Sequence, residues 1–287
     1  MSLRSLLSVI PSVPTSDGAG VKLRRALGAY EGQRLDPFLM LDEFYSDDPR
    51  DYIAGFPAHP HRGFETVTYM LDGHLRHEDH LGNRGELRSG GVQWMTAGRG
   101  IIHSEMPQQD SGRMRGFQLW INLPAAEKMK PAGYRDIPAE ALARSADGRV
   151  TLIAGQLTLG ETTLRGPVNG GEAAYATDPL YADLHLNAGD QLELPVQRGH
   201  QSFLYVYEGE AEVVGEHGSR ALPLRSAGIL GDGDHVQLRA GERGARALLL
   251  AGKPLREPIV QYGPFVMNTH AEIERAVRDY QTGRLTL

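Results

Sequence analysis

The chain has 287 residues, of which 40% are hydrophobic and 23% charged, a composition typical of globular rather than disordered proteins. It contains no cysteine, which excludes disulfides, thiolate metal sites and a cysteine nucleophile. A formal net charge of −6 weighs against direct binding to nucleic acid, which needs a positive field. Glycine (35) and proline (17) are plentiful, as in turn-rich β proteins.

The N-terminal apolar run, Leu6–Ile10, is short and is ended by Pro11, so we expect a first strand rather than a signal peptide. No stretch is long enough to span a bilayer, and we expect a cytoplasmic protein without a membrane partner. Apolar and β-branched runs then predict strands at Val21–Arg25, Leu35–Phe44, Thr66–Leu71, Val92–Met95 and Phe117–Leu123. If Leu35–Phe44 is buried, Asp42 and Glu43 need partners or solvent.

Residues 125–150 change character, with Pro131, Gly133 and Pro138 in close succession. We therefore place a first domain at residues 1–132, a linker at 133–150 and a second domain at 151–287. The linker has room for one short helix at Glu140–Arg144.

The second half contains a weak internal repeat of the first. Tyr205–Gly209 is similar to Tyr69–Gly73, and Leu224–Gly228 is similar to Leu87–Gly91. The matched order and nearly equal spacing favour duplication of one β domain.

The sequence predicts one clear helix, at the C-terminus. Thr269 and Glu272 form a capping box, and Gly283 is a plausible stop. Ile273, Val277 and Tyr280 give an apolar stripe that we expect to pack on a barrel.

Two pairs of potential metal ligands lie in the first half. His59 and His61 are separated by one residue, as are His103 and Glu105. Residues i and i+2 of a β-strand point to the same face, so each pair presents two ligands on one side if its segment is a strand. Two such strands side by side could hold a divalent first-row metal. The alternative is two unrelated pairs of polar residues, since such pairs are common by chance.

The other histidines are interpreted differently. A crowded segment ends at the turn Gly82–Asn83, and we interpret it as a solvated hairpin end rather than a second metal site; it contains His74, His77, Glu78, Asp79 and His80. We interpret the isolated histidines as surface or satisfied core residues; they are His185, His200, His217 and His235. His270 begins the terminal helix, where we assign it no role.

Three segments together resemble the pirin family of the cupin superfamily: LDPFLMLDEF (35–44), GFPAHPHRGFETVTYMLDG (55–73) and GGVQWMTAGRGIIHSEMP (90–107). The C-terminal half is similar in layout only, ending in QYGPFVMNT and the helix. The resemblance implies an all-β bicupin, with two jelly-roll β-barrels facing each other and a C-terminal helix. It also implies one divalent metal in the N-terminal barrel. Iron is the expected metal, with nickel, manganese, cobalt, copper and zinc as alternatives.

The resemblance places the metal ligands on His59, His61, His103 and Glu105. Cupins typically have a glutamate ligand shortly after H-x-H, and Glu65 has such a spacing. Because the residue matching Glu105 takes the carboxylate role in pirins, we interpret Glu65 as a supporting or structural group. The internal repeat maps the four positions onto residues without a histidine, so we expect a metal-free C-terminal barrel; these residues are Pro195, Gln197, Ala240 and Glu242.

Two functions are implied. Some pirins resemble quercetin 2,3-dioxygenases, which open a flavonol ring with O₂ and release carbon monoxide; Glu105 would then be the catalytic base. Others are regulators whose metal state changes their affinity for protein partners such as transcription factors. A metal-dependent isomerase or another dioxygenase stays open. Phe56, Arg62 and Phe64 flank the ligands and either line the pocket or serve barrel packing or a surface ion pair. We expect a monomer.

Overall fold

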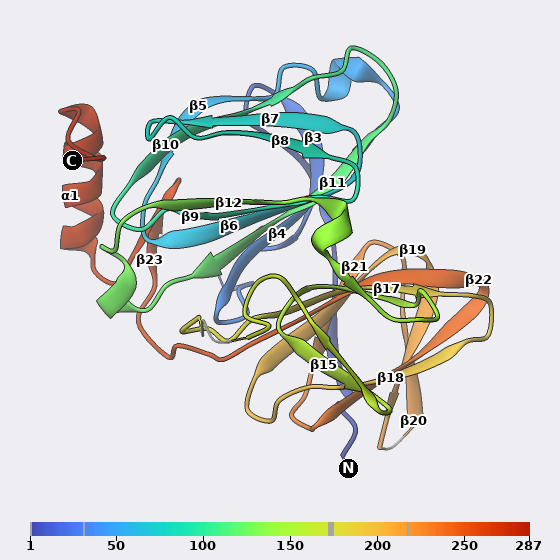
Figure 1. The fold of residues 1–287 in the computed structure, drawn as a ribbon. Helices are drawn as coiled ribbons and strands as arrows, with labels where there is room; N and C mark the ends of the chain where they lie inside the picture. Colours follow the sequence, from blue (N-terminus) through green and yellow to red (C-terminus); the bar gives the residue numbers. More distant parts are fainter. Residues whose placement is uncertain (1, 31, 172–174, 217) are drawn as a thin grey trace. The chain divides into compact units, whose positions relative to one another are not determined.

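The computed structural model describes residues 2–30, 32–171, 175–216 and 218–287 (Figure 1). These residues form two compact units, and each contains strands from separate parts of the chain. The N-terminal barrel unit comprises residues 14–28, 38–139 and 255–287. The C-terminal barrel unit comprises residues 1–13, 29–37 and 140–254. Strands dominate both units, as the sequence predicts.

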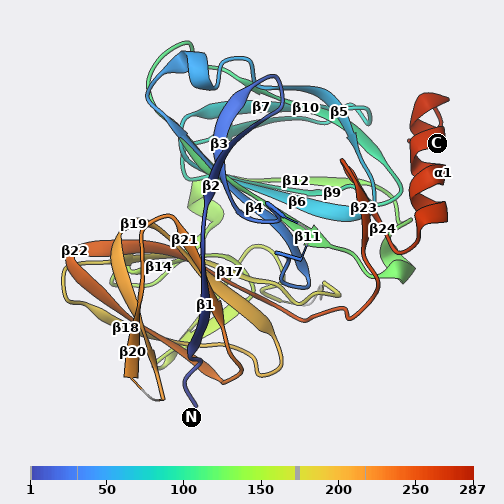
Figure 2. The ribbon, with the colours of Figure 1, turned by 180° about the vertical axis from the view of Figure 1, so that it is seen from behind.

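The N-terminal barrel unit is built from two sheets that lie as layers (Figures 1 and 2). The larger sheet has the order β12 (Gly133–Ile137), β9 (Val92–Thr96), β6 (Phe64–Asp72), β11 (Met114–Asn122), β4 (Phe38–Ser46), β3 (Val21–Leu27) and β2 (Val13–Asp17). The smaller sheet has the order β5 (Phe56–His61), β10 (Ile101–Pro107), β7 (His74–Asp79) and β8 (Arg84–Arg88). Apolar side chains of both sheets meet in one core, among them Phe44, Met70, Leu75 and Leu87.

The acidic pair at the end of the predicted strand Leu35–Phe44 is buried within β4 and has partners. The Arg25 guanidinium of the neighbouring strand β3 donates to both carboxylate oxygens of Asp42, at 2.8 and 2.7 Å. Arg115 of β11, on the other side, reaches Glu43 at 3.4 Å. Cross-strand neighbours therefore satisfy the two acids, as a buried carboxylate requires.

The C-terminal segment adds β23 (Val260–Tyr262), β24 (Phe265–Met267) and α1 (His270–Gln281), which Figure 2 shows beside one another. The predicted capping box between Thr269 and Glu272 is confirmed in both directions. Ile273 and Ala276 face a cluster with Phe265, Met267 and Leu285, whereas Tyr280 of the expected stripe is 42% exposed. Within the described residues α1 is the one α-helix, and no described helix is long and apolar enough to cross a membrane.

The C-terminal barrel unit is organised around one large sheet with a leucine-rich core. Its main path is β1 (Leu6–Pro11), β21 (Ser226–Leu230), β19 (Gln201–Gly215), β22 (His235–Gly252), β17 (Leu180–Leu186), β14 (Val150–Ala154) and β13 (Ala143–Arg144). Strand β18 (Gln191–Pro195) pairs with β22, β20 (Gly218–Leu222) pairs with β19, and β15 (Gln156–Leu159) pairs with β16 (Thr162–Arg165). Short 3₁₀ helices lie elsewhere at Pro49–Asp51, Ala125–Glu127 and Ala139–Ala141.

The units differ from the domain boundaries expected at residues 132 and 150. Strand β1 pairs with β21 and so belongs to the C-terminal barrel unit, while α1 belongs to the N-terminal barrel unit. The expected linker contains β12, which extends the larger sheet beside β9, and the helix expected at Glu140–Arg144 is a 3₁₀ turn followed by β13. The reason is that strands from distant parts of the chain join the edges of a sheet through hydrogen bonds. Composition does not indicate which sheet such a strand joins.

Candidate metal centre

Three histidines converge on the smaller sheet of the N-terminal barrel unit. Strands β5 and β10 pair antiparallel, with His59 opposite His103 and His61 opposite Ile101. The ring centroids lie 4.4 Å apart for His59 and His103, 4.7 Å for His59 and His61, and 5.0 Å for His61 and His103. One ligand nitrogen from each ring lies within 4.8 Å of the others. The strand parity expected for these pairs therefore brings the imidazoles together, and such a group could hold a metal ion.

The hydrogen bonds of these rings suit metal binding. His59 Nδ1 lies 2.8 Å from the carbonyl oxygen of Pro57 and must donate to it, which leaves the lone pair on Nε2. His61 Nδ1 and His103 Nε2 are buried and have no hydrogen-bond partner in the described part of the chain. Burial, followed by the neighbouring histidines, holds the pKa of His61 and of His103 well below the ordinary value. Neutral rings with unpaired nitrogens are what a divalent cation requires.

Glu105 lies two residues beyond His103 on β10, and its carboxylate is outside the group of three histidines. The side chain is buried, with 3% of its surface exposed. The Thr68 hydroxyl donates to Oε1 and the Gln118 amide donates to Oε2, each at 3.0 Å. Trp120 Nε1 in turn donates to Gln118 Oε1 at 3.3 Å. The carboxylate is thus held from the larger sheet, across the barrel interior.

A cavity of about 580 Å³ opens beside the histidines. His59 and His61 lie in its wall together with Arg25 and Gln118, and its apolar lining includes Leu39, Met40, Phe56, Pro57 and Trp120. This volume lies within the range of small-molecule sites. The cavity is therefore large enough to admit a small organic molecule beside His59 and His61.

The residues that flank the histidines have distinct surroundings. Phe56 lines the cavity, whereas Phe64 is fully buried against Trp120, with ring centroids 4.3 Å apart. Arg62 is buried and donates to the carbonyl oxygens of Arg99 and Leu285 and, at 2.8 Å, to Asp279 Oδ2. Arg62 thus serves packing and an ion pair rather than the pocket.

Glu65 lies on β6, outside the histidine group. Its carboxylate accepts a hydrogen bond of 2.6 Å from the Thr96 hydroxyl of the neighbouring strand β9. Burial raises the pKa of Glu65 above its ordinary value, although hydrogen bonds oppose the shift. These contacts suit the supporting role expected from the sequence.

The interpretation of residues 74–80 as a solvated hairpin end is corrected at two residues, His77 and Asp79, whose side chains are buried. His74 reaches Glu86 at the surface, as expected, but His77 on β7 is 99% buried, with 1% of its surface exposed. The His77 ring stacks on Tyr134 at 4.1 Å, and its Nδ1 lies 3.4 Å from His103 Nδ1. Strand alternation was the signal for this placement, because His77 has the same parity as the apolar Leu75, whose side chain faces the barrel core.

The isolated histidines have polar partners. His185 contacts Asp183 at 2.9 Å, His200 contacts Asp178 at 3.4 Å and His235 contacts Asp234 at 2.8 Å. His270 is exposed at the start of α1, and His217 lies outside the described residues. These contacts agree with the surface or satisfied roles expected for the three described histidines. The expected absence of metal from the C-terminal barrel stays a prediction.

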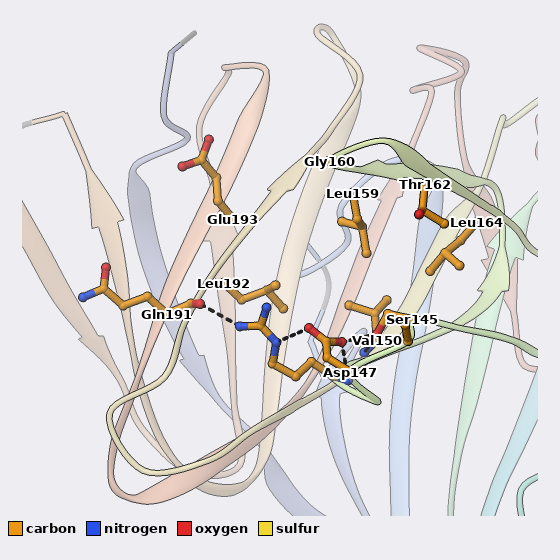
Figure 3. Close-up of a pocket in the computed structure, with 12 residues that line it drawn as sticks. Ser145, Asp147, Val150, Leu159, Gly160, Thr162, Leu164, Gln191, Leu192 and Glu193 are labelled. Atoms are coloured by element: carbon orange, nitrogen blue, oxygen red, sulfur yellow. Dashed lines mark hydrogen bonds and ion pairs between the residues drawn. The ribbon is translucent and has the colours of Figure 1, made fainter.

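A second cavity, of about 420 Å³, lies in the C-terminal barrel unit (Figure 3). Its apolar lining includes Leu159, Leu164 and Leu192, and Figure 3 shows these side chains beside Asp147 and Gln191. Arg149 donates to Asp147 Oδ2 at 2.6 Å and to the Gln191 carbonyl at 3.1 Å. No histidine is among its described lining residues.

The fold and the histidine cluster define a two-domain, all-β cupin with a candidate metal centre in its N-terminal barrel. Family models for pirin and for the pirin C-terminal cupin domain match residues 20–121 and 181–286. A Pseudomonas aeruginosa protein provisionally named quercetin 2,3-dioxygenase is 55% identical, with 99% of each chain covered. Human pirin is 39% identical, with 99% of this chain and 94% of pirin covered.

A crystal structure of quercetin 2,3-dioxygenase from Acinetobacter baumannii is also similar. It is 33% identical, covers 99% of each chain and superposes with a TM-score of 0.86. The chain belongs to the pirin family, and the bicupin fold expected from the sequence is confirmed.

Proposed function

We propose that this chain is a metal-dependent dioxygenase that opens the heterocyclic ring of a quercetin-like flavonol with O₂ and releases carbon monoxide. The observation that carries the proposal is the three-histidine cluster, in which His61 and His103 are buried and His59 and His61 line a cavity with aromatic and apolar residues. The names of the Pseudomonas and Acinetobacter relatives support the same reaction. Flavonol and O₂ are the substrates, and the reaction needs no protein partner.

His59, His61 and His103 would hold the metal, with Glu105 as a fourth protein ligand. The fit rests on the unpaired nitrogens of His61 and His103 and on the purely nitrogen and oxygen donor set of a chain without cysteine. Iron is the proposed metal. When bound, it would supply the Lewis acidity that stabilises a flavonol oxyanion and the redox chemistry of the reaction with O₂.

Glu105 is the proposed base. One of its carboxylate oxygens accepts the proton of the flavonol 3-hydroxyl, which turns the substrate into an electron-rich enolate. Thr68 and Gln118, which each donate to a different oxygen of Glu105, keep the carboxylate oriented while the proton moves. Positioned general bases typically contribute about 10²- to 10⁴-fold to a rate.

The cavity walls orient the substrate and exclude water. Phe56 and Trp120 offer aromatic faces, and Leu39 and Met40 offer apolar surface to the flavonol rings. The apolar part of the wall disfavours bulk water around the enolate, which limits its reprotonation before O₂ reacts. The flavonol then loses one carbon as carbon monoxide, while both oxygen atoms of O₂ enter the organic product.

The proposal is tested by assaying quercetin turnover under air with the iron, nickel, manganese and cobalt forms of the purified protein. The expected result is loss of flavonol absorbance with release of carbon monoxide in at least one form, and none in the metal-free protein. If each form binds its metal but none turns over quercetin, the proposed dioxygenase activity is contradicted. That result would favour the alternative, a regulator whose metal state changes its affinity for other proteins such as transcription factors.

A further inference from the structure

A row of buried polar side chains extends from His103 of the histidine cluster toward the turn between β7 and β8. In the pairing of β10 with β7, His103 lies opposite Asp79, and Glu105 lies opposite His77. The His77 and His103 ring centroids are 5.2 Å apart, and the two Nδ1 atoms are 3.4 Å apart. On its other side, His77 Nε2 lies 3.2 Å from Asp79 Oδ2. Asp79, His77 and His103 thus form a continuous series of hydrogen-bonding contacts.

Asp79 can only accept in this series. Its side chain is 0% exposed, and the backbone N–H groups of Leu81 and Asn83 donate to Oδ1 at 2.9 and 3.1 Å. The Asn83 amide donates to Oδ2 at 2.9 Å. Burial alone would raise the pKa of Asp79, but the hydrogen bonds from Asn83 and His77 outweigh it and hold the pKa below the ordinary value. An ionised carboxylate has no hydrogen to give, so His77 Nε2 carries the hydrogen of that contact.

The direction of one bond sets the direction of the next. With its hydrogen on Nε2, a neutral His77 has its lone pair on Nδ1, facing His103 Nδ1 at the long end of hydrogen-bond range. His103 must then carry its hydrogen on Nδ1. Its Nε2, which is buried and has no hydrogen-bond partner in the described residues, is left with the lone pair beside His59 and His61.

We propose that Asp79 and His77 are positioning residues that fix His103 as its Nδ1–H tautomer and so present the Nε2 lone pair to the metal. This inference rests on the metal site proposed above. Tyr134 supports it by stacking on His77 with an interplanar angle of 16°, which restrains the ring in the orientation that both contacts require. Groups that hold a histidine ligand by its second nitrogen commonly tune metal affinity.

Asp79→Asn provides the sharpest test, because it should reverse the donor and acceptor roles in each hydrogen bond of the series. The two backbone N–H groups fix the new amide oxygen in the place of Oδ1, so the amide nitrogen takes the place of Oδ2. There it donates to His77 Nε2 and, once the Asn83 amide has turned over, to the Asn83 side-chain oxygen. His77 must then carry its hydrogen on Nδ1 and donate it to His103 Nδ1, which moves the His103 hydrogen to Nε2. An amide in place of an orienting carboxylate imposes the wrong tautomer on the histidine that it holds.

The first readout is long-range ¹H–¹⁵N NMR of the metal-free protein with ¹⁵N-labelled histidine, which distinguishes the two tautomers without metal or activity. We expect Nδ1–H for His103 in the wild type and Nε2–H in Asp79→Asn. His77→Phe keeps the stacking on Tyr134 and removes the acceptor, so the preference for Nδ1–H should be lost. His77→Asn, which returns an acceptor near the Nδ1 position, should restore it. His74→Gln, on the same strand but paired with Glu86 at the surface, is the matched control.

The second readout is the dissociation constant of the metal. We expect roughly 10- to 100-fold weaker binding in Asp79→Asn and His77→Phe, and an unchanged constant in His74→Gln. An Nε2–H tautomer of His103 in the wild type would overturn the inference, as would an unchanged tautomer and an unchanged affinity in both variants. A wild type with the Nδ1–H tautomer that binds no metal would refute the proposed metal site and leave the tautomer assignment standing. Unchanged backbone NMR spectra check that each variant is folded.

Discussion

At the scale of single residues, the two glutamates near the histidine cluster differ in their hydrogen-bond partners. Glu105 accepts hydrogen bonds from Thr68 and Gln118 and lies two residues beyond His103 on β10. Glu65 is bonded to Thr96 on the larger sheet. The spacing of Glu65 after H-x-H would allow either residue to be the carboxylate ligand. We propose Glu105, rather than Glu65, as the group that moves a proton.

Glu105→Gln keeps the size of the side chain and removes the base. We expect the variant to retain metal through the three histidines while kcat for quercetin falls about 100-fold or more, because a positioned base is lost. Metal content and turnover are measured on the same sample. Glu65→Gln is the matched control for removal of a buried carboxylate. Turnover that persists in Glu105→Gln with metal retained would exclude Glu105 as the base.

Lys128 is a buried cation that predicts a pH-dependent stability. Its ammonium donates to Asn122 Oδ1 at 2.7 Å, to the Gly63 carbonyl at 2.8 Å and to the Val266 carbonyl at 3.0 Å. Burial lowers the pKa of Lys128 to about 8, while Glu257 and Glu272 oppose the shift. Between that value and the unfolded pKa near 10.5, the unfolded chain binds more protons, so the contribution of Lys128 to stability rises with pH.

Lys128→Met should remove this dependence. We expect the free energy of unfolding of the wild type, measured by urea denaturation from pH 8 to 10, to gain on the order of 2 kcal/mol relative to the variant. Parallel curves for the two proteins would show that the Lys128 ammonium titrates as it does in the unfolded chain.

The sequence predicts the histidines of the cluster far better than the residues that contact the site from other strands. His59, His61 and His103 follow from the two-residue periodicity of strands, which is local. Thr68, Gln118 and His77 reach the site through pairing of strands that lie far apart in the chain, and that register is not visible in composition or spacing.

At the scale of elements, the C-terminal segment is part of the structure that carries the histidines. Val266 N donates to the Arg62 carbonyl, and Arg62 N donates to the Pro264 carbonyl, so β24 is tied to the residue after His61. Gly63, with a φ of +93°, lies so close to the Val266 carbonyl that an added Cβ would approach it to 2.0 Å. The capping box predicts where α1 begins, but its docking partner depends on these long-range contacts.

Asp279→Asn should loosen this attachment. The buried Arg62 guanidinium would lose its charged partner, and we expect a loss of stability on the order of 2 kcal/mol with faster hydrogen exchange in α1. Glu274→Gln is the control, because its ion pair with Arg278 is exposed and worth little. Equal exchange in the two variants would show that the Arg62–Asp279 pair does not hold the helix.

At the scale of the whole molecule, the chain forms two barrels whose members come from interleaved segments. Duplication of a β domain could be predicted from the repeat, but the exchange of terminal segments could not, because β1 and α1 carry no mark of the unit that they join. The candidate metal ligands lie within the N-terminal barrel unit.

Metal should therefore protect that unit selectively. At a free concentration 100 times its dissociation constant, a bound ligand adds about 2.7 kcal/mol to the stability of the folded form. We expect slower hydrogen exchange in β5 and β10 on metal addition, with little change in β17 and β18 of the C-terminal barrel unit. Equal protection of both units would argue against a single site in the N-terminal barrel.

The most direct test of the account is the metal stoichiometry of the purified chain, measured by elemental analysis after anaerobic loading with ferrous iron. Binding by three imidazoles predicts about one equivalent per chain for the wild type and for the control His185→Ala. The double variant His59→Ala/His103→Ala should bind almost none. A wild type that retains no metal, or a double variant that retains as much as the wild type, would contradict the assignment of His59, His61 and His103 as the metal centre.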